Sequence, residues 1–110
     1  MSEGLLDIEG GTLRVIATRS ASQLAVRLIG EMDVACTNLL TRVDEVDLTG
    51  VDNITVNLSG LEFIDSSGIQ AFLNFRTLHA KAGRRVSFIL PQPFVRRIFA
   101  VLGLEDHLTN

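Results

Sequence analysis

The sequence predicts an α/β fold in which a mixed sheet of about four to five strands has helices packed against it. Short segments rich in β-branched residues alternate with segments whose apolar residues recur every three or four positions. Glycine residues fall at the ends of several of these segments. Read from the N-terminus, the order is β-β-α-β-α-β-α. At 110 residues and 46% hydrophobic content, we expect a single domain over residues 1–110 with one core.

The first half of the chain predicts a hairpin and a helix. Residues 12–18 and 24–29 are two strand-like segments separated by five residues, and Gly30 ends the second. After a loop over residues 31–33, apolar residues recur at helical spacing. This predicts a helix that ends near Gly50. Its apolar residues are Leu39, Leu40, Val43 and Val46.

Residues 53–58 predict a central strand, which is followed by the short apolar stretch 61–64. A helix then runs to about Ala82 and is stopped by Gly83. Phe72 and Phe75 are spaced so that both cannot easily face the core, and we expect one of them to be exposed.

The last third of the chain predicts a strand and a helix. Residues 85–90 are apolar enough for a strand that is buried on both faces. Pro93 suits the first turn of a helix, and this helix extends to Gly103 with a buried apolar stripe. Four arginines lie at element ends or outside that stripe: Arg84, Arg85, Arg96 and Arg97. The alternatives are a basic patch that faces a partner and a solvated rim, and the sequence favours the rim.

Composition argues against several classes of function. The formal charge of −3 and a pI near 5.2 give no cationic field for nucleic acid. The acidic N-terminus does not resemble a signal peptide, and no apolar run approaches the ~20 residues of a membrane span. We therefore expect a cytoplasmic protein without membrane insertion.

The single Cys36 has no cluster of metal ligands around it in the sequence. We therefore expect no metal or cofactor, and we expect the thiol to be buried and inert.

The segment Asp65-Ser66-Ser67-Gly68 is the most informative part of the sequence. It places two hydroxyls and a carboxylate where a strand gives way to a helix. The unpaired amides and the dipole at a helix start stabilise a phosphate by roughly 0.3–1 kcal/mol. The local pattern alone favours the simpler role of Ser66 or Ser67 as a helix cap, which contributes about 1 kcal/mol.

Three longer blocks carry a family resemblance. They are residues 28–33 (Leu-Ile-Gly-Glu-Met-Asp), residues 58–68 (Leu-Ser-Gly-Leu-Glu-Phe-Ile-Asp-Ser-Ser-Gly) and residues 91–104, which begin Pro-Gln-Pro-Phe-Val-Arg-Arg. Each resembles the corresponding block of the anti-sigma factor antagonist family of STAS domains. The blocks occur in the family's order and cover about residues 12–108, so the resemblance implies the STAS fold.

The resemblance also implies the site residues. In that family the serine directly after the aspartate is phosphorylated, which assigns phosphorylation to Ser66. Asp65, Ser67 and Gly68 then become flanking partner-binding residues. The family's loop aspartate, which contacts the kinase, matches Asp33, although Asp33 can equally cap the following helix.

The implied function is bacterial partner switching without catalysis by this chain. The unphosphorylated protein would bind an anti-sigma factor, itself a serine kinase, and thereby release a sigma factor. Phosphorylation of Ser66 would end binding, and a serine/threonine phosphatase would reset the switch. The family usually continues beyond Gly103 and Leu104 into a last strand and helix, which we expect to be reduced or absent here.

Three other functions are compatible with a chain of this size to different degrees. A hydrolase lacks a Gly-x-Ser-x-Gly motif, and its only candidate bases, His79 and His107, are expected to be exposed or partly buried away from the site. A nucleotide-binding role lacks the phosphate-binding loop. The alternative that stays open is a STAS accessory subunit of a lipid or anion transporter, because one fold serves several functions.

Overall fold

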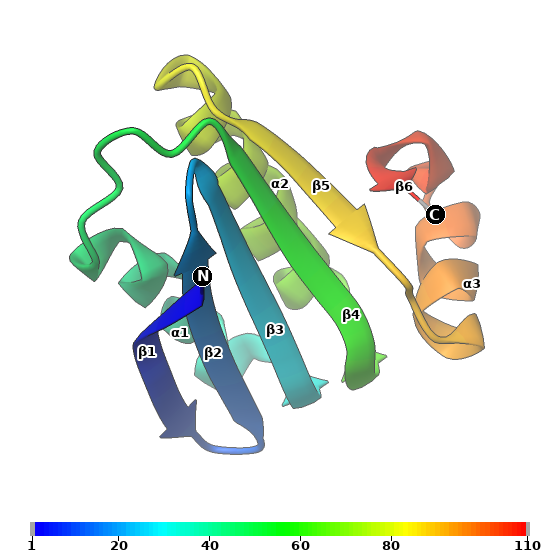
Figure 1. The fold of residues 1–110 in the computed structure, drawn as a ribbon. Coiled ribbons are helices and arrows are strands. Elements are labelled where there is room, and N and C mark those ends of the chain that lie inside the picture. The colour runs from blue at the N-terminus through cyan, green and yellow to red at the C-terminus, as the bar shows by residue number, and fades with distance from the viewer. Residues whose placement is uncertain (1, 110) are drawn as a thin grey trace.

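The computed structural model describes residues 2–109 and forms one six-stranded mixed sheet (Figure 1). The strands lie side by side in the same order as in the chain. The pairs β1/β2 and β2/β3 are antiparallel, and the remaining three pairs are parallel. The predicted α/β architecture with a mixed sheet is confirmed. The strands are β1 (Ser2–Gly10), β2 (Leu13–Ser20), β3 (Gln23–Met32), β4 (Asn53–Ile64), β5 (Arg85–Ile89) and β6 (Leu108–Thr109).

Two strands lie outside the predicted set, so the sheet exceeds the expected four to five strands. β1 pairs along its length with β2, and the cross-strand ion pair between Arg14 and Asp7 (2.7 Å) reinforces the pairing. Gly11, with a φ of 59°, forms the tight turn between them. β6 is only two residues long and pairs with β5.

The longest helices are α2 (Ser66–Lys81) and α3 (Pro93–Val101), which agree with the predicted ones. The single helix predicted after β3 is wrong. That segment consists of η1 (Val34–Cys36), the four-residue α1 (Asn38–Thr41) and η2 (Arg42–Glu45). The Thr41 hydroxyl donates to the Asn38 carbonyl at 2.7 Å, which illustrates how side chains here compete for backbone groups. A further short turn is η3 (Glu105–His107).

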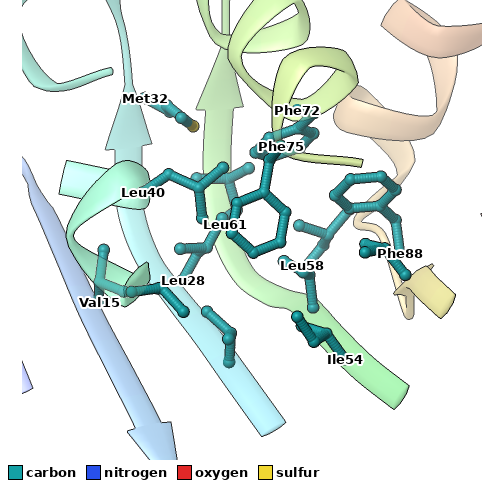
Figure 2. Packing of buried hydrophobic residues seen from close by; sticks show 14 of the residues in the cluster. Val15, Leu28, Met32, Leu40, Ile54, Leu58, Leu61, Phe72, Phe75 and Phe88 are labelled. Carbon is teal, nitrogen blue, oxygen red and sulfur yellow. The ribbon is translucent and has the colours of Figure 1, made fainter. Parts of the chain in front are cut away.

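The core lies on the face of the sheet that α1 and α2 cover (Figure 2). Alternate residues of β2 to β5 point into it, while their neighbours stay half-buried or exposed on the other face. The prediction that residues 85–90 are buried on both faces is therefore wrong. Val86 and Phe88 are buried, but Ile89 is only half-buried and Leu90 is 53% exposed.

Phe72 and Phe75 are both buried, which corrects the expectation that one is exposed. The ring of Phe72 stacks on Phe88 with 4.9 Å between centroids. Phe75 lies on the side of α2 that faces α1, and its ring packs 4.4 Å from that of His79. Because α2 contacts both the sheet and the α1 segment, its buried face is wider than one stripe. His79 is only 2% exposed and thus fully buried, contrary to expectation.

None of the helices within residues 2–109 combines the length and the apolar character that crossing a bilayer requires.

Candidate phosphorylation and partner-binding site

The carboxyl ends of β3 and β4 bring the predicted site residues together. These strands are parallel, and Met32 pairs in register with Ile64. Asp33 and Asp65 come directly after this pair, and the backbone N–H of Asp65 donates to the Met32 carbonyl at 3.3 Å. Two distant segments of the chain therefore meet at one edge of the sheet.

Asp65 is the residue that caps α2. Its Oδ1 atom accepts the backbone N–H of Gly68 at 2.9 Å, and its backbone carbonyl accepts that of Ile69 at 3.0 Å. The interpretation of Ser66 or Ser67 as the helix cap is therefore wrong. An aspartate fills this role as well as a serine does, and its charge also favours the positive end of the helix dipole.

Ser66 occupies the first position of α2 and is exposed, whereas Ser67 is half-buried. Within the part of the chain that the structure describes, the Ser66 hydroxyl makes no hydrogen bond. The side chain is consequently accessible to a modifying enzyme without loss of an internal contact. A phosphate there would lie beside the first amides of a 16-residue helix.

Gly68 allows the start of α2 to lie against the ends of the two strands. A Cβ atom at this position would lie 2.6 Å from Cγ1 of Ile64 and 3.1 Å from the carbonyl oxygen of Met32. Both distances are shorter than normal van der Waals contact. Because glycine has no Cβ atom, the start of α2 can lie close enough to β3 and β4 to fix the position of Asp65 and Ser66.

Asp33 is also a cap, since its Oδ1 atom accepts the backbone N–H of Ala35 at 2.9 Å. The buried thiol of Cys36 lies 3.5 Å from the same oxygen. Burial raises the pKa of this thiol, and the negative charges of Asp33 and Asp65 act in the same direction. The thiol thus stays protonated, in agreement with the inert role expected for it.

Apolar side chains are exposed close to the two aspartates. Val34, which follows Asp33, is 72% exposed. Phe63, two residues before Asp65, is 37% exposed and stacks on Phe94 of α3 with 5.6 Å between ring centroids. Sequence reasoning missed these residues. The available signal was that aromatic and aliphatic residues directly flank the polar motif.

The remaining candidates for chemistry lie elsewhere. His79 is 13 residues after Ser66 on α2, which corresponds to about 20 Å along the helix axis. His107 contacts Arg76 through its Nδ1 atom. Residues 2–109 contain no group of three His, Cys, Asp or Glu side chains arranged to hold a metal ion.

Known proteins resemble this chain in sequence and in fold. A family model described as Mlab, STAS domain, matches residues 16–110. An anti-sigma F factor antagonist from Lysinibacillus sphaericus is 37% identical over 84 residues, which are 74% of this chain and 71% of the relative. The chain belongs to the anti-sigma factor antagonist family of STAS domains.

Solved structures support the fold of this anti-sigma factor antagonist family member. The unphosphorylated form of the anti-sigma factor antagonist SpoIIAA superimposes with a TM-score of 0.70 at 24% identity, covering 86% of this chain and 85% of that one. An anti-sigma factor antagonist from Mycobacterium paratuberculosis gives 0.72 at 18% identity, covering 87% and 82%. The murine anion transporter Slc26a9 gives 0.64 at 15% identity, covering 91% of this chain but only 18% of the transporter.

Proposed function

We propose that this protein is a bacterial anti-sigma factor antagonist whose binding to an anti-sigma factor is switched by phosphorylation of Ser66. The anti-sigma factor is a serine kinase in this proposal, and its capture releases a sigma factor. The kinase phosphorylates Ser66 and the complex dissociates, after which a serine/threonine phosphatase removes the phosphate. The chain acts in the cytoplasm as a single domain over residues 1–110 and has no catalytic activity of its own.

The observation that carries the proposal is the exposed Ser66 directly after the capping Asp65, in a relative of an anti-sigma F factor antagonist. Solved structures of SpoIIAA in unphosphorylated and phosphorylated forms are among its structural neighbours. Because Asp65 already caps the helix, the serine hydroxyl is not needed for folding. Its modification can therefore change binding and leave the fold intact.

Charge explains how the switch would work. A phosphate adds about −1.5 to −2 charges next to Asp65, and Asp33 lies at the same edge of the sheet. A partner that fits the uncharged serine would meet repulsion and would have to desolvate the phosphate. Each ~1.4 kcal/mol lost lowers the affinity tenfold.

The exposed apolar residues beside the site fit the contact surface of such a partner. Val34, Phe63 and Phe94 offer apolar area next to the serine, and the aromatic pair supplies rigid side chains of the kind enriched at interfaces. We propose that Asp33, Asp65, Ser67 and Gly68 flank this surface and shape it. A phosphate on Ser66, at the rim of this surface, would then weaken the contacts that the partner makes with the neighbouring residues.

The test is a pull-down from a bacterial lysate with Ser66→Ala and Ser66→Asp proteins as paired baits, followed by mass spectrometry. Ser67→Ala and Ser67→Asp form the matched control pair. We expect an ATP-dependent serine kinase to be retained at least tenfold more strongly by Ser66→Ala than by Ser66→Asp. Incubation with that kinase and ATP should then modify wild type and Ser67→Ala but not Ser66→Ala.

Two results would contradict the proposal. Phosphate mapped to Ser67 would move the modification site. Equal retention of a membrane transporter by both Ser66 baits would favour the accessory-subunit function, for which the likeness to Slc26a9 supplies only a shared fold.

A further inference from the structure

A second site lies at the other end of the sheet from Ser66. A hollow of about 710 Å³ opens between the start of β4, the second half of α2 and the start of β5. This region is at the top of Figure 1, whereas β4 ends at the bottom. Ser66 and Arg76 of the hollow are ten residues apart on α2, about 15 Å along its axis. The hollow is therefore separate from the proposed phosphorylation site. Its lining residues are Asp52, Asn53, Arg76, Ala80, Gly83, Arg84, Arg85 and Val86.

Three arginines and one aspartate are among the residues that line this hollow. Arg76, Arg84 and Arg85 outnumber Asp52, which gives the lining a net charge of +2 in a protein whose net charge is −3. Concave surfaces of one charge sign focus the electrostatic potential and raise the local concentration of counter-ions. The electrostatic potential in the hollow is therefore expected to be positive, although the protein as a whole is negatively charged.

These arginines lack the ion pairs that neutralise others in the chain. Arg14 pairs with Asp7 at 2.7 Å, and Arg42 pairs with Glu45 at 3.0 Å. In contrast, no side-chain carboxylate that the structure describes forms an ion pair with any of the three arginines of the hollow. No described carboxylate therefore neutralises these arginines in a direct ion pair, and Arg84 also lines a neighbouring hollow that contains Asp44 and Asp47.

Neighbouring side chains hold two of the three guanidinium groups in place. Arg76 contacts the Nδ1 atom of His107 in η3. Arg84 lies 3.4 Å from the Nδ1 atom of the buried His79. Arg85 extends from the first position of β5, where its backbone N–H donates to the Asp52 carbonyl at 2.9 Å. Groups fixed in this way lose less conformational entropy when they bind a ligand.

From this geometry we infer that the hollow binds the phosphate group of a small molecule. Guanidinium groups present planar, paired N–H donors that match phosphate oxygens, and three arginines line this one concavity. The volume falls within the range of small-molecule sites, about 300–1,000 Å³. The ligand is either free phosphate or a phosphomonoester, and both share the dianionic group that the arginines recognise.

The experiment is a titration of the ¹⁵N-labelled full chain, followed by two-dimensional NMR at constant ionic strength. The probes are inorganic phosphate and glycerol 3-phosphate, with chloride as the reference anion. We expect saturable shifts of the amides around the hollow, from residues 52, 53 and 83–86. Tenfold tighter binding of glycerol 3-phosphate would identify a phosphomonoester site, and equal affinity would identify a free-phosphate site.

Matched charge reversals provide the decisive comparison. Arg85→Glu should weaken phosphate binding at least tenfold, whereas Arg97→Glu, on the exposed side of α3, should change it less than twofold. Both side chains are exposed, and the amide spectra report directly that each variant is folded. Absence of saturable shifts, or equal weakening by both variants, would overturn the inference.

The result is independent of the proposed switch. Ser66→Ala should bind phosphate in the hollow as wild type does, and Arg85→Glu should still be phosphorylated at Ser66 by the kinase. If the protein shows saturable phosphate shifts but no kinase binds it or modifies Ser66, only the switch is refuted. If a kinase modifies Ser66 but phosphate causes no saturable shifts, only the anion site is refuted.

Discussion

The Nε2 atom of the buried His79 lies 2.9 Å from Oδ1 of Asp44, which joins the last turn of α2 to the short helical segment after β3. Burial lowers the pKa of His79; the Asp44 charge opposes this shift, and the Arg84 charge reinforces it. The imidazole is therefore neutral in the folded protein at neutral pH.

This pair predicts a loss of stability in mild acid. The unfolded chain protonates His79 near pH 6.5, and the folded protein does so only at lower pH. Between these two pKa values the unfolded state binds more protons, so the free energy of unfolding decreases as the pH falls. Melting temperatures at pH 7.5, 6.5 and 5.5 should decline in wild type and decline less in His79→Gln.

Two further variants sharpen the pH measurement. Asp44→Asn removes the charge that raises the histidine pKa, so its stability should fall more steeply with acid than that of wild type. His107→Gln replaces the other histidine of the chain and is the control for exchanging an imidazole for an amide outside the core of α2. Parallel profiles for His79→Gln and wild type would refute the prediction.

Substitution of Gly68 should destabilise the fold by about 1–3 kcal/mol through overpacking. Alanine is the better helix former by about 1 kcal/mol, yet its Cβ would lie 2.6 Å from Ile64. Urea denaturation of Gly68→Ala measures the net effect. Gly4→Ala is the control, because a Cβ there meets nothing within 4 Å, and a Gly68 variant as stable as this control would contradict the argument.

Two substitutions of Asp65 separate the contribution of its helix cap to stability from the contribution of its charge. Asp65→Ala should lose about 1 kcal/mol of stability, while Asp65→Asn should be close to wild type because asparagine caps equally well. Glu62→Ala, an exposed carboxylate on β4, should change stability by less than about 0.5 kcal/mol. Equal losses for the Ala and Asn variants at position 65 would show that the cap is not the source of the effect.

A negative charge at position 66 should leave the protein at least as stable as wild type. Ser66 lies at the positive end of α2, where a carboxylate contributes about 0.3–1 kcal/mol. Thr77→Asp places the same charge on an exposed position toward the other end of α2 and should not stabilise. If thermal unfolding shows Ser66→Asp to be clearly destabilised, loss of partner binding by that variant would reflect misfolding.

Hydrophobic periodicity predicted β2 to β5, α2 and α3, because each carries enough apolar residues to define its period. The β1 strand was not predicted because its alternation of apolar and acidic residues covers only residues 6–9. Pairing with β2 extends the strand over Ser2–Gly10. The helix after β3 was overestimated because four apolar residues at the right spacing do not prevent Thr41 and its neighbours from competing for backbone groups.

Adjacent site residues were predictable from a contiguous motif, whereas contacts across the fold could not be derived from the residue pattern. The meeting of Asp33 with Asp65 was implied only by the family resemblance, because it depends on the parallel register of β3 and β4. The burial of His79 and of Phe75 depends on the α1 segment, which packs on a second side of α2. The arginine-lined hollow combines α2, β4 and β5, so its residues could be recognised as a group only in three dimensions.

The order of strands in the sheet is also the order of strands in the chain. No later strand has to insert between two earlier ones, and the first three are joined by turns of two residues each. Such a sheet can grow from one edge as the chain leaves the ribosome, each strand adding to a partner that is already present. Short-range pairing of this kind lowers the entropy lost before native contacts form and favours rapid folding.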